Sequence, residues 1–201
     1  MFALIDDQQI TKFFSGNRGV TLGDVQYPKS IFSLWSEVER NAIGIYEVTV
    51  DTTNRKDEQW YINTNVSYGV ESNKAVGSYG TATAKAHADI LFTAQDEIDG
   101  LGTEGEVAAR GLKYNLIQTV KRQAAGILQD TDWYIVRKAD AGTAVPSAIT
   151  THRAAVRTKA AEQETAITNA ADTPALETLY TYTTTDGVQS RPLGELPRLE
   201  T

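Results

Sequence analysis

The sequence predicts an α+β protein with an antiparallel, β-rich N-terminal domain, an extended connector and a helical C-terminal domain that ends in an extended tail. Three observations predict this order. Short apolar segments separated by turn residues fill positions 1–70, Gly, Ser, Thr and Ala are abundant over 71–102, and apolar residues at helical spacing recur over 103–201. We expect these three ranges to be the domains.

Two β-hairpins are expected near the N-terminus. The apolar segments 2–5 and 10–14 flank a polar break, which is typical of a hairpin. The segments 20–22 and 25–27 repeat the arrangement around a two-residue loop that begins with glycine. Such a loop matches the twist of two paired strands.

A short helix and a further strand pair should complete the N-terminal domain. Apolar residues recur at helical spacing over 33–41, and Gly44 follows as a stop signal. The segment 45–50 alternates apolar and polar residues as a half-buried strand does. We expect the segment 59–63 to pair with it after a polar loop.

The connector and the first long helix meet near position 103. From 66 to 102 the main apolar run is 90–92, so we expect an extended arm with room for one more hairpin. Thr103 and Glu106 fit the capping box, in which each side chain satisfies a free backbone N–H of the first helical turn. The first helix should therefore start near Thr103.

Two further helices are expected, each with proline in its first turn. One begins near Pro146 and the other at Thr173 and Pro174. The helix after Pro146 is rich in alanine and should pack closely, as a hairpin with the first helix or against copies of itself. The segment 133–136 could extend the first helix or form a buried segment. The prolines of 191–197 predict an extended surface tail.

The composition excludes several classes of function. The chain has 201 residues, with 19 basic against 26 acidic side chains and a formal charge of -7. Because the basic residues are dispersed, we expect no binding to nucleic acid or to membrane surfaces. Cysteine is absent, which excludes thiolate metal sites and cysteine nucleophiles. The first apolar run is too short for a signal peptide, so we expect the protein to fold in a cytoplasm.

No arrangement of reactive residues predicts an enzyme, and we expect no cofactor and no metal. His87 and His152 lack the local partners of a metal site, so both are expected to be surface or interface histidines. The acidic segment 96–100 lacks the ligand pattern of a calcium loop and is expected to be a solvated turn. A hydrolase would need an acid pair such as Asp96 and Glu104 inside a cleft, and this alternative stays open.

The three tryptophans allow two interpretations. Trp35, Trp60 and Trp133 each lie in an apolar neighbourhood, which favours a place in the core. The alternative is a receptor- or glycan-binding module, whose sign would be a cluster of exposed Trp60, Tyr61 and Trp133.

Six segments carry a resemblance to known proteins. They are 2–5, 23–35, 42–48, 131–138, 145–158 and 192–197. Their layout combines an N-terminal β segment that ends in a Gly-Ile-Tyr strand with a C-terminal Asp-Trp that is followed by an arginine-rich helix. Together they resemble a family of proteins from tailed bacteriophages, in particular phages of marine bacteria, and the layout is similar to tail fibre assembly and tail-associated proteins.

The resemblance implies a non-catalytic structural protein of the virion, in the tail or tail fibre region, with the host cytoplasm as the place of assembly. Its partners would be other phage structural proteins and copies of itself, as a trimer or hexamer. Trp133, Tyr134, Arg153 and Arg157 are the expected contact residues, because aromatic residues and arginine dominate interface energetics. An alternative is a tail fibre assembly chaperone that is absent from the finished virion.

Overall fold

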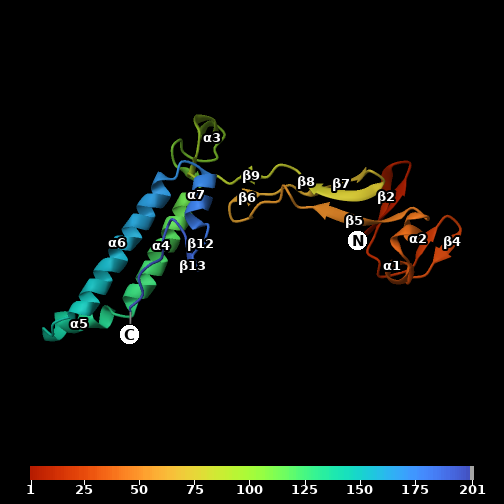
Figure 1. The fold of residues 1–201 in the computed structure, drawn as a ribbon. Coiled ribbons are helices and arrows are strands. Elements are labelled where there is room, and N and C mark those ends of the chain that lie inside the picture. Colours follow the sequence, from red (N-terminus) through yellow and green to blue (C-terminus); the bar gives the residue numbers. More distant parts are fainter. Residues whose placement is uncertain (200–201) are drawn as a thin grey trace. The chain divides into compact units, whose positions relative to one another are not determined.

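The computed structural model describes residues 1–199 and divides the chain into two compact units, Met1–Thr83 and Ala84–Thr201. The predicted α+β class is confirmed, because strands dominate up to residue 111 and four helices follow over 112–180. Figure 1 labels the elements of both units. Each unit is described by itself.

A five-stranded sheet forms most of the first unit. The predicted hairpin of 2–5 and 10–14 is confirmed as its first two strands, which pair around a turn where Asp7 and Gln8 both have positive φ. A further hairpin follows at 66–79, within the segment 66–102 where the sequence allowed one more hairpin. In sheet order the strands are β2 (Gln9–Phe14), β1 (Phe2–Asp6), β5 (Ile45–Asp51), β8 (Lys74–Tyr79) and β7 (Val66–Glu71).

Strand β5 is the central strand, and its partners differ from the prediction. It pairs antiparallel with β1 and parallel with β8, with Val48 opposite Ala75. The expected partner at 59–63 contributes only β6 (Tyr61–Ile62), which pairs with β9 (Thr83–Ala84). The predicted pairing of 45–50 with 59–63 is therefore wrong. The six-residue strand β8 offers a longer ladder than the two residues of β6.

The predicted hairpin of β3 (Val20–Leu22) and β4 (Val25–Tyr27) is confirmed. The single helix expected over 33–41 is instead two short helices, α1 (Ile31–Leu34) and α2 (Glu37–Asn41). Ser36 interrupts them because its side chain and that of Glu39 form a capping box at the start of α2.

The core of the first unit lies where these helices cover the sheet. Phe14, Ile31 and Ile45 are buried together. Arg40, also buried, places its guanidinium 5.3 Å from the centroid of the Phe2 ring and donates to the Trp35 carbonyl. The core therefore joins one residue from each of β2, α1 and β5. The partly buried residues packed around it are Phe2, Leu4, Val20, Leu22, Tyr27, Phe32, Trp35 and Ile43.

The second unit begins with a hairpin that corrects the predicted start of the first long helix. Strand β10 (Ile90–Leu91) pairs with β11 (Val107–Ala109), and the loop between them carries α3 (Ala94–Ile98). Thr103 and Glu106 form a turn inside this loop, in which the Glu106 N–H donates to the Thr103 carbonyl at 3.1 Å. The pairing of β11 prevents a helix there, and the first long helix starts only at Leu112.

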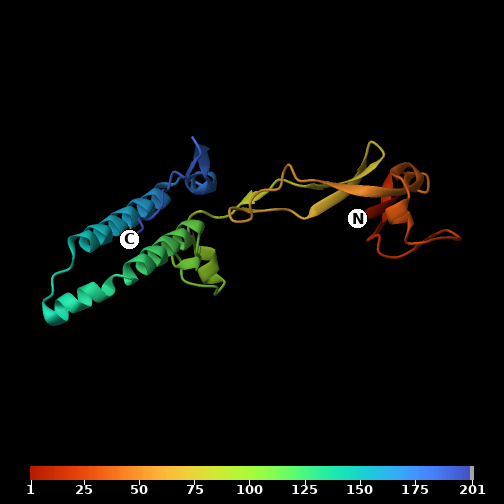
Figure 2. The same cartoon turned by 60° about the horizontal axis from the view of Figure 1, so that its bottom comes forward.

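Two long helices form the body of the second unit. Helices α4 (Leu112–Gln129) and α6 (Ser147–Asn169) lie side by side in Figure 1 and Figure 2, which confirms the predicted helical hairpin. The predicted starts of α6 and of α7 (Thr173–Tyr180) are confirmed. The segment 133–136 belongs to a separate helix, α5 (Asp132–Ala141). It lies at the end of the pair where α4 ends and α6 begins (Figure 1).

The chain after α7 packs back onto the helices. A short hairpin of β12 (Thr183–Thr185) and β13 (Val188–Ser190) comes first. Leu193 is then buried, and its N–H donates to the Leu179 carbonyl at 3.0 Å. The Gln163 side chain of α6 donates to the Gly194 carbonyl at 3.0 Å. Through these two hydrogen bonds and the buried Leu193, the segment 191–197 packs against α6 and α7.

Candidate functional site

The feature that stands out in the second unit is the exposed apolar surface of α5. Trp133, Ile135 and Val136 are 51%, 43% and 66% exposed, and none of the ten residues of α5 is buried. A surface helix normally buries one apolar stripe against its own domain. The unit therefore leaves the apolar side chains of α5 uncovered.

The two aromatic rings of α5 stack on each other, and an arginine side chain of the same helix lies close to both rings. The ring centroids of Trp133 and Tyr134 are 3.8 Å apart, with an interplanar angle of 31°. The Arg137 guanidinium lies 4.6 Å from the Trp133 ring and 5.4 Å from the Tyr134 ring. This ordered group of Trp, Tyr and Arg has the composition of an interface hot spot. We call the residues Trp133, Tyr134, Ile135, Val136 and Arg137 the aromatic patch.

Arg153 of α6 positions the start of α5. Its guanidinium donates to the Leu128 carbonyl and to the Thr131 hydroxyl, both at 2.7 Å, and forms an ion pair with Asp132 at 2.8 Å. The Leu128 carbonyl is one of the last four of α4, which have no partner inside the helix. Arg153 therefore closes the end of α4 and fixes the first residue of α5.

The structure separates the four expected contact residues. Trp133 and Tyr134 lie in the aromatic patch, and Arg157 is exposed on α6. Arg153 is only 7% exposed, and both terminal nitrogens of its guanidinium are bound within the chain. We therefore revise its expected role, because a buried and paired guanidinium supports the fold rather than touching a partner.

Two other expectations about single residues are wrong. Trp133 is exposed rather than in the core, whereas Trp60 is buried as expected. His152 is 8% exposed and belongs to the buried face of α6, so it is not a surface histidine. Both Trp60 and Tyr61 are buried, which removes the exposed aromatic cluster that a glycan-binding module would need.

The acidic segment 96–100 is part of a capped helix rather than a simple turn. The Asp96 carboxylate accepts hydrogen bonds from the N–H and the hydroxyl of Thr93, at 2.8 and 2.7 Å. These bonds lower the pKa of Asp96, the backbone bond more than the hydroxyl. Glu104 is exposed to solvent. Asp96 and Glu104 therefore do not form an acid pair inside a cleft.

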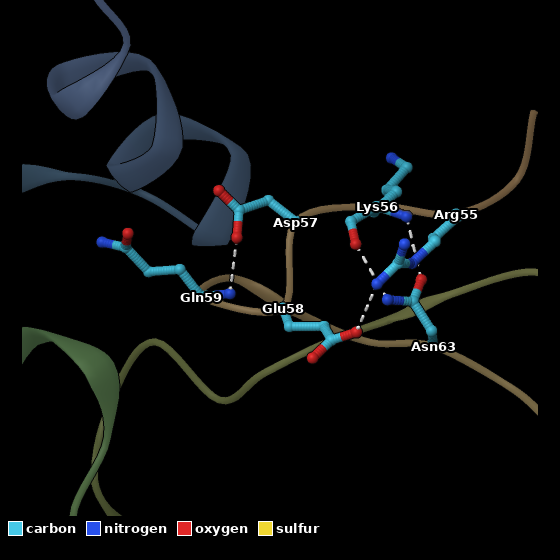
Figure 3. A network of polar contacts seen from close by, with 6 residues as sticks. All are labelled: Arg55, Lys56, Asp57, Glu58, Gln59 and Asn63. Carbon is cyan, nitrogen blue, oxygen red and sulfur yellow. Dashed lines mark hydrogen bonds and ion pairs between the residues drawn. The ribbon is translucent and has the colours of Figure 1, made fainter. Parts of the chain in front are cut away.

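A second group of charged residues lies in the loop after β5 (Figure 3). Arg55 and Glu58 form an exposed ion pair at 3.1 Å. The Asn63 amide binds the backbone of Lys56 in both directions, at 2.9 and 2.8 Å, and the Asp57 carboxylate accepts from the Gln59 N–H at 2.8 Å. These contacts close the loop on itself, so we assign them a structural role.

The part of the chain that the structure describes holds no group of three or more His, Asp or Glu side chains arranged to bind a metal ion. None of the helices within residues 1–199 is long and apolar enough to cross a membrane. Comparison with protein-family profiles, curated proteins and solved structures finds no match to this chain.

Proposed function

We propose that the chain is a non-catalytic structural component of a tailed phage virion, in the tail or tail fibre region, that acts through contacts between subunits. The observation that carries this proposal is the aromatic patch. Exposed apolar side chains on an ordered helix favour a partner that covers them. Arg153 holds that helix in place before any partner binds.

The location of the patch agrees with the resemblance to tail-associated proteins. One of the segments that carry the resemblance, 131–138, includes the first seven residues of α5. The partners that we propose are other phage structural proteins and copies of this chain in a trimer or hexamer. The net charge of -7 disfavours nucleic acid as a partner.

The second candidate is a tail fibre assembly chaperone that leaves before the virion is complete. The same patch favours it, because a chaperone also needs an apolar surface that is open in the free protein. The two candidates differ in whether the patch is covered permanently.

Mass spectrometry of purified particles, from a phage whose genome encodes the chain, tests the proposal. We expect the protein in the particles at the copy number of a whole set of the proposed trimers or hexamers. Absence from the particles, together with abundance in infected cells, would overturn the proposal and support the chaperone.

A variant of the patch tests its role in the same assay. Trp133→Ala combined with Val136→Ser should lower incorporation into particles, because both side chains are largely exposed and contribute little to the fold. Leu34→Ser, at a side chain that is 80% exposed in the first unit, is the control and should leave incorporation unchanged. Unchanged incorporation of the double variant would show that the aromatic patch is not the contact surface.

A further inference from the structure

A groove lies between α4, α6 and the C-terminal segment, by which we mean residues 182–198 after α7. Its volume is about 690 Å³, and Gly126, Ile127 and Leu196 provide the apolar part of its lining. Arginines from α4 and from the C-terminal segment also line it. We call this the C-terminal groove, and its polar lining includes Arg122, Gln163, Tyr182, Arg191, Glu195 and Arg198.

The C-terminal groove has an excess of positive charge. Three arginines line it against one carboxylate, Glu195. That carboxylate already binds the Arg191 guanidinium, at 2.7 and 3.0 Å, and the Tyr182 hydroxyl, at 2.6 Å. Within residues 1–199, Arg122 and Arg198 have no ion pair with a carboxylate. An apolar ligand that carries negative charge therefore fits the groove.

The loop between β10 and β11 presents a surface of this kind. Ile98 and Leu101 are 79% and 65% exposed. Three carboxylates, those of Asp96, Glu97 and Asp99, lie within the same six residues. We call residues 94–101 the acidic knob. The apolar side chains of the knob are among the most exposed of the chain, so the rest of the unit does not pack against them.

The acidic knob is ordered at both ends. Thr93 and Asp96 form a capping box at the start of α3. At its end, the Gly100 N–H donates to the Glu97 carbonyl at 3.1 Å and the Leu101 N–H to the Asp96 carbonyl at 2.8 Å. Gly100 has the positive φ of 72° that this C-terminal motif requires. The knob can therefore bind without a large loss of conformational entropy.

We propose that the acidic knob of one copy binds in the C-terminal groove of a second copy. Ile98 and Leu101 would cover the apolar lining, while the carboxylates of Glu97 and Asp99 would face Arg122 and Arg198. The Asp96 carboxylate stays bound to Thr93. The knob lies at the end of the α4–α6 pair opposite α5 (Figure 1, Figure 2), and the groove lies along the second half of α4.

Because knob and groove are different surfaces, the contact is head-to-tail and continues from copy to copy until a ring closes. It leaves the aromatic patch free for other proteins. The inference rests on the proposed function only in that the chain works through contacts with copies of itself.

Two single variants, each of which disables one side of the contact, test the proposal. Ile98→Asp disables the knob and Arg198→Glu disables the groove, and both residues are exposed. Light scattering coupled to size-exclusion chromatography should show an oligomer for the unchanged protein and a mass near the 22.0 kDa of one chain for each variant. Leu34→Asp is the matched control, because Leu34 is 80% exposed in the first unit and should not alter the mass.

Mixing the two variants gives the sharpest result. The intact groove of Ile98→Asp should bind the intact knob of Arg198→Glu, and the mixture should therefore form a one-to-one dimer that cannot grow. A mixture that stays monomeric, variants that keep the oligomer, or an unchanged protein that is monomeric would each overturn the proposal.

The outcome is separable from that of the virion experiment. If the unchanged protein is present in particles but monomeric in solution, the knob contact is wrong and the virion role stands. If the mixture forms the dimer but particles lack the protein, the knob contact stands and the virion role fails.

Discussion

Arg153 shows how one buried cation holds three parts of the helical unit together. It lies on α6, closes the last turn of α4 through the Leu128 carbonyl and pairs with Asp132 at the start of α5. A buried guanidinium needs hydrogen bonds and a counter-charge to offset its desolvation, and a neutral replacement removes one donor each from the Leu128 carbonyl and the Thr131 hydroxyl and the cation beside Asp132. The arrangement of α5 relative to α4 and α6 therefore depends on this residue.

We predict that Arg153→Ala lowers the free energy of unfolding by about 1–3 kcal/mol, as expected for the loss of a buried guanidinium and its hydrogen bonds, the Asp132 end of the ion pair being exposed. Arg157→Ala, one turn further along the same helix and exposed, should change it by less than about 0.5 kcal/mol. Urea unfolding followed by circular dichroism measures both. Equal effects of the two variants would show that the buried contacts of Arg153 add nothing to stability.

At the scale of single residues, the sequence indicated the candidate site only in part. The Asp-Trp-Tyr segment drew attention to Trp133 and Tyr134, which the structure places in the aromatic patch. Burial was harder to predict. Trp60 and Trp133 both have apolar neighbours in sequence, but only Trp60 is covered by its unit. Arg153 and Arg157 look alike in sequence, and their difference depends on the helix face that meets α4.

The start of α4 is determined by a close approach between backbones. Gly111 is its N-cap, and a Cβ at this position would lie 2.2 Å from the Ala88 carbonyl oxygen. The Asp89 carboxylate accepts from the Gly111 N–H at 2.8 Å and from Arg110 at 2.6 Å. Both bonds lower the pKa of Asp89, the Gly111 bond most. The segment before α4 is thus tied to its first turn.

We predict opposite effects for two glycine substitutions in and next to α4. Gly111→Ala should destabilise the unit by about 1–3 kcal/mol, because the added methyl group displaces the backbone at Ala88. Gly126→Ala should stabilise it by up to about 1 kcal/mol, because it lies inside the helix with open space around the added carbon. Thermal and urea unfolding give both values. A stabilising Gly111→Ala would contradict the close approach.

Elements were predictable where their signals are local. The two-residue turn of β3 and β4 and the prolines at the starts of α6 and α7 predicted these elements correctly. Capping boxes were ambiguous, since Thr93 and Thr103 are each followed three residues later by a carboxylate. The pairing of β11 with β10 decides between them, and this contact depends on residues on both sides of the loop.

The chain as a whole consists of two units with separate cores. Phe14, Ile31 and Ile45 form the core of the first unit, and the facing sides of α4 and α6 provide most of that of the second. The class and the order of β-rich and helical parts followed from the sequence. The partners of β5 did not, because pairing between distant segments leaves no signal in a local pattern.

We predict that each unit folds without the other. Fragments 1–84 and 85–201 keep β9 and the contact of Thr173 with the Lys85 carbonyl intact. Each fragment should give a dispersed amide NMR spectrum whose peaks overlay those of the whole chain away from the cut. A fragment with the collapsed spectrum of an unfolded chain would show that its core depends on the other unit.

The parallel pairing of β5 with β8 sets an order of events during synthesis. β1 can join β5 as soon as residue 51 has left the ribosome, but the other side of β5 has no partner until residue 79 follows. At about 5–20 residues per second, this interval lasts about 1.5–6 s. During it, β5 presents Val48 and Val50 beside an open strand edge to neighbouring nascent chains. The yield of correctly folded protein should thus depend on how quickly translation passes through this stretch.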